Sequence, residues 1–188
     1  IFWFILGAVL ILSGCTENKD SQNDMSGTSQ PDTELVAVIT NDTSNPFFVE
    51  WDTPFGIPPF DEIRDEHYKP AFLEGIVGQR VDIDAIRNNT EPPTFENTYQ
   101  ALELAGPLLE RVNRVFSNIT STETNEYLQQ LDVEMSPLLT RETDAIYLDE
   151  AIFNRFNIVY EQRESLNLDD QEMRLVELVY RDFVRRGA

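Results

Sequence analysis

The sequence predicts an all-α fold preceded by an extended arm that is rich in proline and aromatic residues. Three observations lead to this prediction. Apolar residues recur at a spacing of about 3.6 residues from residue 69 to the end of the chain. Good N-cap residues, such as Asp149 and Asp169, precede several of these apolar stripes. No stretch after residue 45 shows the alternating pattern of a half-buried strand.

Residues 1–15 form an apolar run that ends in Leu12-Ser13-Gly14-Cys15. A membrane-spanning helix needs ~20 residues, so we interpret the run as the core of a signal peptide. Its last four residues resemble a bacterial lipobox, and we therefore predict lipid attachment at Cys15. The alternative is a buried free cysteine in a hydrophobic segment. Because Ile1 is not methionine and no basic segment precedes it, we expect the true start of the protein to lie upstream.

Residues 16–44 are rich in Ser, Thr, Asn and Asp, with a brief apolar patch at residues 35–39. This composition is typical of a disordered polar tether, here between the lipid and a domain. Thr16 follows the predicted lipidated cysteine and resembles the sorting signal of outer-membrane lipoproteins. The sequence thus predicts a lipid-anchored protein of the bacterial cell envelope, at the outer membrane and facing the periplasm.

Residues 45–72 form the arm, which carries five of the ten prolines, Trp51 and five phenylalanines. So many prolines exclude a regular helix or a central strand. Disordered segments have few aromatic residues, so we expect these rings to pack onto the helices that follow. The first helix is predicted to start at Lys69 with Pro70 at its first position, where the missing N–H costs nothing.

Five helical segments are predicted in residues 45–188, which we assign to one incomplete helical domain. The first ends at Asn88-Asn89. The others follow Thr94, residues 122–124, Asp149 and Asp169, and the last has a capping box completed by Glu172. A kink is expected at Gly106-Pro107, and Pro137 is expected to bend or divide the third segment.

Charge argues against nucleic acid as a partner. The chain has 34 acidic and 14 basic residues and a net charge of −20, which would repel a phosphate backbone. Cys15 is the one cysteine, so the chain offers neither a disulfide framework nor a cysteine cluster for zinc. Close carboxylates are interpreted as solvated or capping groups rather than catalytic pairs; these are Asp61-Glu62, Asp65-Glu66, Asp82 with Asp84, and Asp169-Asp170.

An ordered series of short blocks resembles the N-terminal part of the peptidyl-dipeptidases (dipeptidyl carboxypeptidases) in the thimet oligopeptidase and oligopeptidase A family of zinc metallopeptidases. The series covers nearly all of residues 45–188, and its order identifies the family better than any single block. The blocks are Asn45-Pro46-Phe47, Pro58-Pro59-Phe60-Asp61, His67-Tyr68, Pro70-Ala71-Phe72, Glu91-Pro92-Pro93-Thr94-Phe95-Glu96-Asn97-Thr98, Arg111-Val112, Val115-Phe116, Asp144-Ala145-Ile146-Tyr147-Leu148 and Tyr180-Arg181-Asp182-Phe183-Val184-Arg185.

The resemblance implies a zinc-dependent hydrolase of short peptides that releases C-terminal dipeptides from a site deep in a mostly α-helical channel. Such enzymes bind zinc through His-Glu-x-x-His and a later glutamate. This chain has one histidine, His67, which is expected to cap or pack rather than to bind metal. We therefore expect a fragment that forms part of the channel wall, has no catalytic or metal-binding residue and is inactive alone, with the zinc ligands in a missing C-terminal half.

The alternative is a non-catalytic, lipid-anchored helical binding or scaffold protein. The sequence leaves open the substrate preference, the choice between endopeptidase and dipeptidyl carboxypeptidase activity, the oligomeric state, the membrane face and the sequence of the catalytic half. The downstream reading frame would separate the two functions, because His-Glu-x-x-His there supports the enzyme.

Overall fold

The computed structural model describes residues 44–187, and every regular element in this range is helical. The all-α prediction is therefore confirmed for these residues. The long helices are α2 (Asp65–Arg87), α4 (Pro107–Thr122), α5 (Glu126–Tyr147), α6 (Glu150–Gln162) and α7 (Asp170–Arg186). The short elements are α3 (Ala101–Glu103), a π-helical turn before it (Phe95–Gln100), and the 3₁₀ turns Pro46–Phe48, Pro54–Gly56 and Arg163–Ser165.

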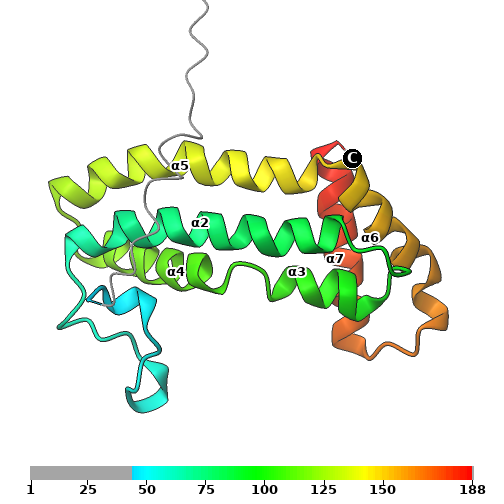
Figure 1. Ribbon diagram of the computed structural model, residues 1–188, viewed down its shortest axis with the longest axis horizontal. Coiled ribbons are helices and arrows are strands. Elements are labelled where there is room, and N and C mark those ends of the chain that lie inside the picture. The colour runs from blue at the N-terminus through cyan, green and yellow to red at the C-terminus, as the bar shows by residue number, and fades with distance from the viewer. Residues whose placement is uncertain (1–43, 188) are drawn as a thin grey trace, which may run out of the picture. The chain divides into compact units, whose positions relative to one another are not determined.

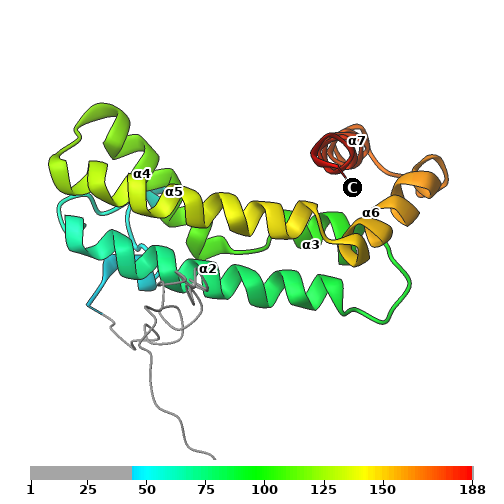
Figure 2. The same ribbon diagram turned by 90° about the horizontal axis from the view of Figure 1, so that it is seen from above.

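Helix α2 is the central element of residues 44–187. It contacts both α4 and α5, and the three helices run side by side (Figures 1 and 2). Helices α6 and α7 pack against each other beside the C-terminal ends of α2 and α5. Helices α2 and α5 thus connect two groups of packed side chains.

The first hydrophobic cluster joins the arm, the N-terminal halves of α2 and α5, and α4. Phe72 and Phe116 meet there edge to face, with ring centroids 5.2 Å apart, which is a favoured geometry for aromatic pairs. The second cluster joins the C-terminal ends of α2 and α5, the π-helical turn, α6 and α7. Its fully buried members include Tyr99, Phe156, Val176 and Phe183. Each fully buried large apolar side chain contributes about 1.5–3 kcal/mol, so α2 and α5 are held at both ends.

Close contact between α2 and α4 depends on Gly75. A Cβ atom at this position would lie 2.8 Å from the Cα and 2.9 Å from the backbone nitrogen of Leu109. Both distances are shorter than real Cβ contacts. The absence of a side chain therefore lets the two helix backbones approach, whereas Gly78, three residues later, has no atom within 4 Å of an added Cβ.

The prediction that the first helix starts at Lys69 is wrong. Helix α2 begins at Asp65 and contains Pro70 in its interior. His67 stabilises the earlier start, because its Nδ1 atom accepts a hydrogen bond of 3.0 Å from the backbone N–H of Arg64. Asp65 and Glu66 also place negative charge in the first turn, where it interacts favourably with the helix dipole and stabilises the helix. The arm therefore ends at Arg64.

Gly106 and Pro107 break the second predicted helix instead of kinking it. Gly106 has a φ of 67°, in the left-handed region that glycine adopts readily, and Pro107 starts α4 as its first residue. The Asp82 carboxylate accepts a hydrogen bond of 2.9 Å from the Gly106 N–H. Long-range hydrogen bonding thus stabilises the break, and the stripe is divided between α3 and α4.

The predicted N-caps at Thr94, Asp149 and Asp169 are confirmed. Each side chain accepts a hydrogen bond from a backbone N–H in the first turn of its helix, and Glu172 completes the predicted capping box. Helix α5 runs unbroken through Pro137, whose side chain is exposed, so the expected division there is wrong and the alternative of a bend stays a prediction.

Candidate functional site

Cys15, the predicted lipid attachment residue, lies outside the described residues, as do the rest of residues 1–43. The interpretation of these residues as leader and tether stays a prediction. Within residues 44–187, no helix is long and apolar enough to cross a membrane.

His67 has a capping role in the first turn of α2. Its ring nitrogen Nδ1 accepts a hydrogen bond from the Arg64 N–H. Its carbonyl oxygen accepts a hydrogen bond of 2.9 Å from the side chain of the buried Asn45. This agrees with the expectation that the histidine caps, although it lies on the helix and not on the arm as predicted. In the described part of the chain, no group of three His, Cys, Asp or Glu side chains could hold a metal ion.

Three of the close carboxylates have structural partners. Asp169 caps α7, and Asp82 accepts the hydrogen bond of Gly106. Asp65 accepts a hydrogen bond of 2.8 Å from the side chain of Asn125, which itself caps α5. These contacts favour the interpretation of the carboxylates as capping and linking groups.

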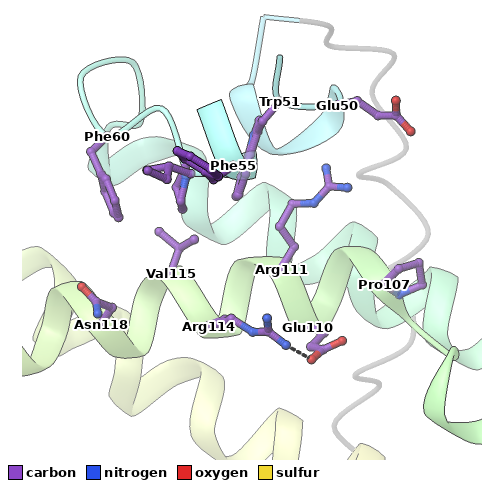
Figure 3. Close-up of a pocket in the computed structure, with 13 residues that line it drawn as sticks. Glu50, Trp51, Phe55, Phe60, Pro107, Glu110, Arg111, Arg114, Val115 and Asn118 are labelled. Atoms are coloured by element: carbon purple, nitrogen blue, oxygen red, sulfur yellow. Dashed lines mark hydrogen bonds and ion pairs between the residues drawn. The ribbon is translucent and has the colours of Figure 1, made fainter. Parts of the chain in front are cut away.

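A groove of about 770 Å³ lies between the arm and α4 (Figure 3). The arm gives it an aromatic wall, and the exposed face of α4 gives it a floor that carries both signs of charge. Glu110 and Arg114 form an ion pair along α4. The lining residues are Glu50, Trp51, Phe55, Gly56, Ile57, Pro58, Phe60, Pro107, Glu110, Arg111, Arg114, Val115 and Asn118.

Arg111 fixes the base of the arm to α4. Its Nη1 atom donates to the carbonyl oxygens of Phe47 at 3.2 Å and Val49 at 3.1 Å. The same guanidinium lies 5.2 Å from the centre of the Trp51 ring, as a cation over an aromatic face. The Trp51 indole N–H donates to the Pro46 carbonyl at 2.8 Å. Phe47 is completely buried beneath these contacts.

The arm has two kinds of aromatic residue. Phe47 is fully buried, and Phe48 and Trp51 pack partly against the first cluster, as predicted. Phe55 is 101% exposed and Phe60 46% exposed, so the expectation that all these rings pack on the following helices is wrong for these two. Both rings line the groove beside α4 instead of packing into the first cluster.

Arg155 is a buried polar centre on α6. Its guanidinium donates to the carbonyl oxygens of Asn89 at 2.7 Å and Glu91 at 3.3 Å, and to the side-chain oxygen of Asn97 at 3.1 Å. Burial lowers the pKa of Arg155, yet arginine stays charged in proteins. The loop between α2 and the π-helical turn is therefore attached to α6. The sequence carried a signal for this role, because Arg155 falls on the same helix face as Ile152, Phe156 and Val159.

A second buried charge is Glu142 on α5, which Arg80 of α2 holds with two hydrogen bonds of 2.7 and 2.8 Å. The hydrogen bonds from Arg80 lower the pKa of the Glu142 carboxyl. Three tyrosines, Tyr68, Tyr99 and Tyr147, have the opposite shift, because burial raises the pKa of each hydroxyl. The pKa of Tyr68 rises to about 12, and the Tyr99 hydroxyl donates to the Phe156 carbonyl. These groups keep fixed protonation states near neutral pH, and their contacts are structural.

The groove combines aromatic and apolar side chains from the arm with charged side chains from α4. Side chains that line the groove include neither histidine nor cysteine nor serine, and the one histidine of the sequence is engaged in a cap. The groove can accept apolar and aromatic groups along the arm and polar groups along α4. Sequence reasoning did not identify the groove, because it forms between segments about 60 residues apart.

No protein-family model matches the chain. Among curated proteins, it is 44% identical over 146 residues to the dipeptidyl carboxypeptidase of Salmonella typhimurium, a match that covers 78% of this chain and 22% of the relative. The dipeptidyl carboxypeptidase of Escherichia coli gives the same identity and covers 21% of that protein. Oligopeptidase A of Salmonella typhimurium is 24% identical over 135 residues, which are 72% of this chain and 20% of the relative. The chain thus spans about a fifth of the length of these relatives.

Proposed function

We propose that this chain is the N-terminal helical part of a longer zinc-dependent peptidase that hydrolyses short peptides and releases dipeptides from their C-termini. The observation that carries the proposal is the 44% identity to dipeptidyl carboxypeptidase over 146 residues. Because the described residues make up most of the chain, most of that match must fall on them. The lower similarity to oligopeptidase A supports the same broader class of peptidases.

The proposed role of residues 44–187 is to form part of a rigid wall beside the substrate channel. Helices α2 and α5 each connect the two hydrophobic clusters, and the ion pair of half-exposed Arg80 with buried Glu142 links the two helices between the clusters. Such a layer resists bending, since both of its ends are packed. A rigid channel wall would admit short peptides and keep folded proteins away from the catalytic centre.

The described residues do not fit a catalytic zinc site. Such a site needs three protein ligands, and residues 44–187 contain no suitable group of side chains. We therefore propose that the zinc ligands belong to another part of the longer protein, where zinc would polarise the scissile carbonyl and activate water. We also propose that Cys15 carries the lipid and holds the enzyme at the outer membrane, facing the periplasm; Leu12-Ser13-Gly14-Cys15 supports this.

The test uses the whole product of the gene that encodes this chain. It is expected to contain His-Glu-x-x-His after the helical part and to release dipeptides from an N-acetylated short peptide with a free C-terminal carboxylate. Amidation of that terminus should prevent release, and a chelator should abolish activity that zinc restores. A product that binds peptides without hydrolysing them would instead support the helical scaffold protein.

A second test uses this chain alone, with zinc titrated by calorimetry and a fluorogenic short peptide as substrate. Neither zinc binding at submicromolar affinity nor turnover is expected. A zinc site that is lost in His67→Ala, or turnover that a chelator stops, would place the catalytic residues in this chain. Either result would refute the proposal that the zinc ligands belong to another part of the longer protein.

A further inference from the structure

Phe55 occupies an unusual position in the arm. It is 101% exposed, which is the highest value among the large apolar side chains of residues 44–187. Its ring stands at the rim of the groove, on the side opposite α4 (Figure 3). An exposed phenylalanine gains no stabilisation from burial in this chain.

The backbone holds Phe55 in a conformation that suits another residue type. Phe55 has φ and ψ angles of 63° and 16°, and Gly56 has a φ of 66°. Two consecutive residues in the left-handed region form a turn that Gly, Asn and Asp dominate. A bulky aromatic residue there is a genuine outlier, and such strain clusters at contact sites and functional sites.

Hydrogen bonds keep this turn closed. The Gly56 N–H donates to the Thr53 carbonyl at 3.0 Å, and the Ile57 N–H donates to the Pro54 carbonyl at 3.4 Å. The Thr53 hydroxyl donates to the Ile57 carbonyl. Arg111 and Trp51 hold the base of the arm on α4, as described above. Phe55 is therefore presented on a supported turn.

Exposed apolar side chains gather on the same segment. Val49 is 42% exposed, Ile57 51% and Phe60 46%, so with Phe55 four large apolar residues within 12 positions face solvent. The other exposed large apolar residues are spread along residues 81–184; they are Val81, Leu104, Tyr127, Val133, Leu148, Ile158 and Val184. Scattered residues need no explanation, whereas a cluster beside a groove indicates an interaction surface.

We propose that Phe55, Ile57, Phe60 and the groove beside them form the surface on which a later part of the same polypeptide packs. This inference rests on the proposed function. The matched segment makes up 22% of the dipeptidyl carboxypeptidase of Salmonella typhimurium, so about four-fifths of that protein's length lies outside the match. A second copy is disfavoured, because each chain carries a net charge of −20 and like charges repel.

The test compares hydrogen exchange in residues 49–60 between this chain and the whole gene product. Burial of the surface in the longer protein is expected to slow exchange in this segment at least ~100-fold. Phe55→Ser should reverse most of this protection there, and should leave the urea midpoint of this chain unchanged. Val133→Ser is the matched control, because Val133 is 71% exposed on α5 and does not line the groove.

Equal exchange of the segment in both proteins would overturn the inference. Two other results would also overturn it: sedimentation as a dimer that Phe55→Ser disrupts, which assigns the surface to a second copy, or protection that appears only when a short peptide is added. Dipeptide release by the whole product is measured separately, so the proposed function can stand when this inference fails. Protection without peptidase activity would support the interface and refute the proposed function.

Discussion

Gly75→Ala is expected to destabilise the fold, whereas Gly78→Ala is expected to stabilise it. Both glycines lie in α2 with ordinary helical backbones, so they differ mainly in their surroundings. An added Cβ at position 75 meets the Leu109 backbone at 2.8 Å, and one at position 78 meets nothing within 4 Å. The pair of substitutions therefore separates helix propensity from the closeness of α2 and α4.

The magnitudes follow from two opposing effects. Alanine in place of glycine inside a helix gains about 0.5–1 kcal/mol, and Gly78→Ala should show this gain alone. At Gly75 the new methyl group is about 0.6 Å short of an ordinary 3.4 Å contact. The obstructing atoms are backbone, so the helices must separate, and overpacking of this kind costs about 1–3 kcal/mol. The two variants should therefore differ in their free energy of unfolding by about 1–3 kcal/mol.

The assay is urea unfolding of both variants and the parent chain, followed by far-ultraviolet circular dichroism. In thermal melts the Tm values should differ by several degrees, because 1 kcal/mol corresponds to about 2–4 °C for a chain of this size. Leu109→Ala should not rescue Gly75→Ala, since the contact is with the backbone of that residue. Equal stabilisation by both alanines would refute the close approach of α2 and α4.

Three further predictions concern buried charges and the leader. Arg155→Met removes hydrogen bonds to two backbone carbonyls and Asn97, so urea titration should show a loss of about 2–4 kcal/mol; a loss within error would contradict the attaching role. Hydrogen bonds from Arg80 lower the pKa of Glu142 in the folded state. The stabilisation is therefore present above the ordinary value of 4.5 and is lost as the pH falls through the folded pKa. The stability difference between the parent and Glu142→Gln should shrink on acidification from pH 7, and a constant difference would exclude this linkage. Cys15→Ser, expressed with the full leader, should lose palmitate incorporation and leave the membrane fraction, whereas unchanged retention would argue against a lipid anchor.

Local signals predicted the helix boundaries that depend on residues three or four positions apart. Asp169 and Glu172 form the expected capping box, and Thr94 and Asp149 cap their helices as expected. Proline predicted helix boundaries less well, because Pro70 and Pro137 both lie inside continuous helices. In each case the neighbouring turns were stable enough to tolerate one missing N–H, which the residue type alone does not reveal.

The sequence did not predict the groove between the arm and α4, because the groove forms between distant segments. Residues of the arm and of α4 that line the groove are about 60 positions apart, and the hydrogen bonds from Arg111 to the arm have no local signature. Composition predicted ordered aromatic residues but could not distinguish buried Phe47 from exposed Phe55. That distinction depends on a turn with two left-handed residues, one of which is not glycine.

The sequence by itself determined that residues 44–187 are helical, where the π-helical turn, α6 and α7 are capped, and which peptidases its ordered blocks resemble. Helical period and capping act over one turn, so they can be recognised in a single chain. Only the tertiary structure decided that Gly75 brings α2 onto α4, that Arg155 attaches a distant loop, and that Phe55 stands beside an open groove. These features depend on pairs of segments whose separation in space is fixed by packing, and no local preference of the chain specifies that distance.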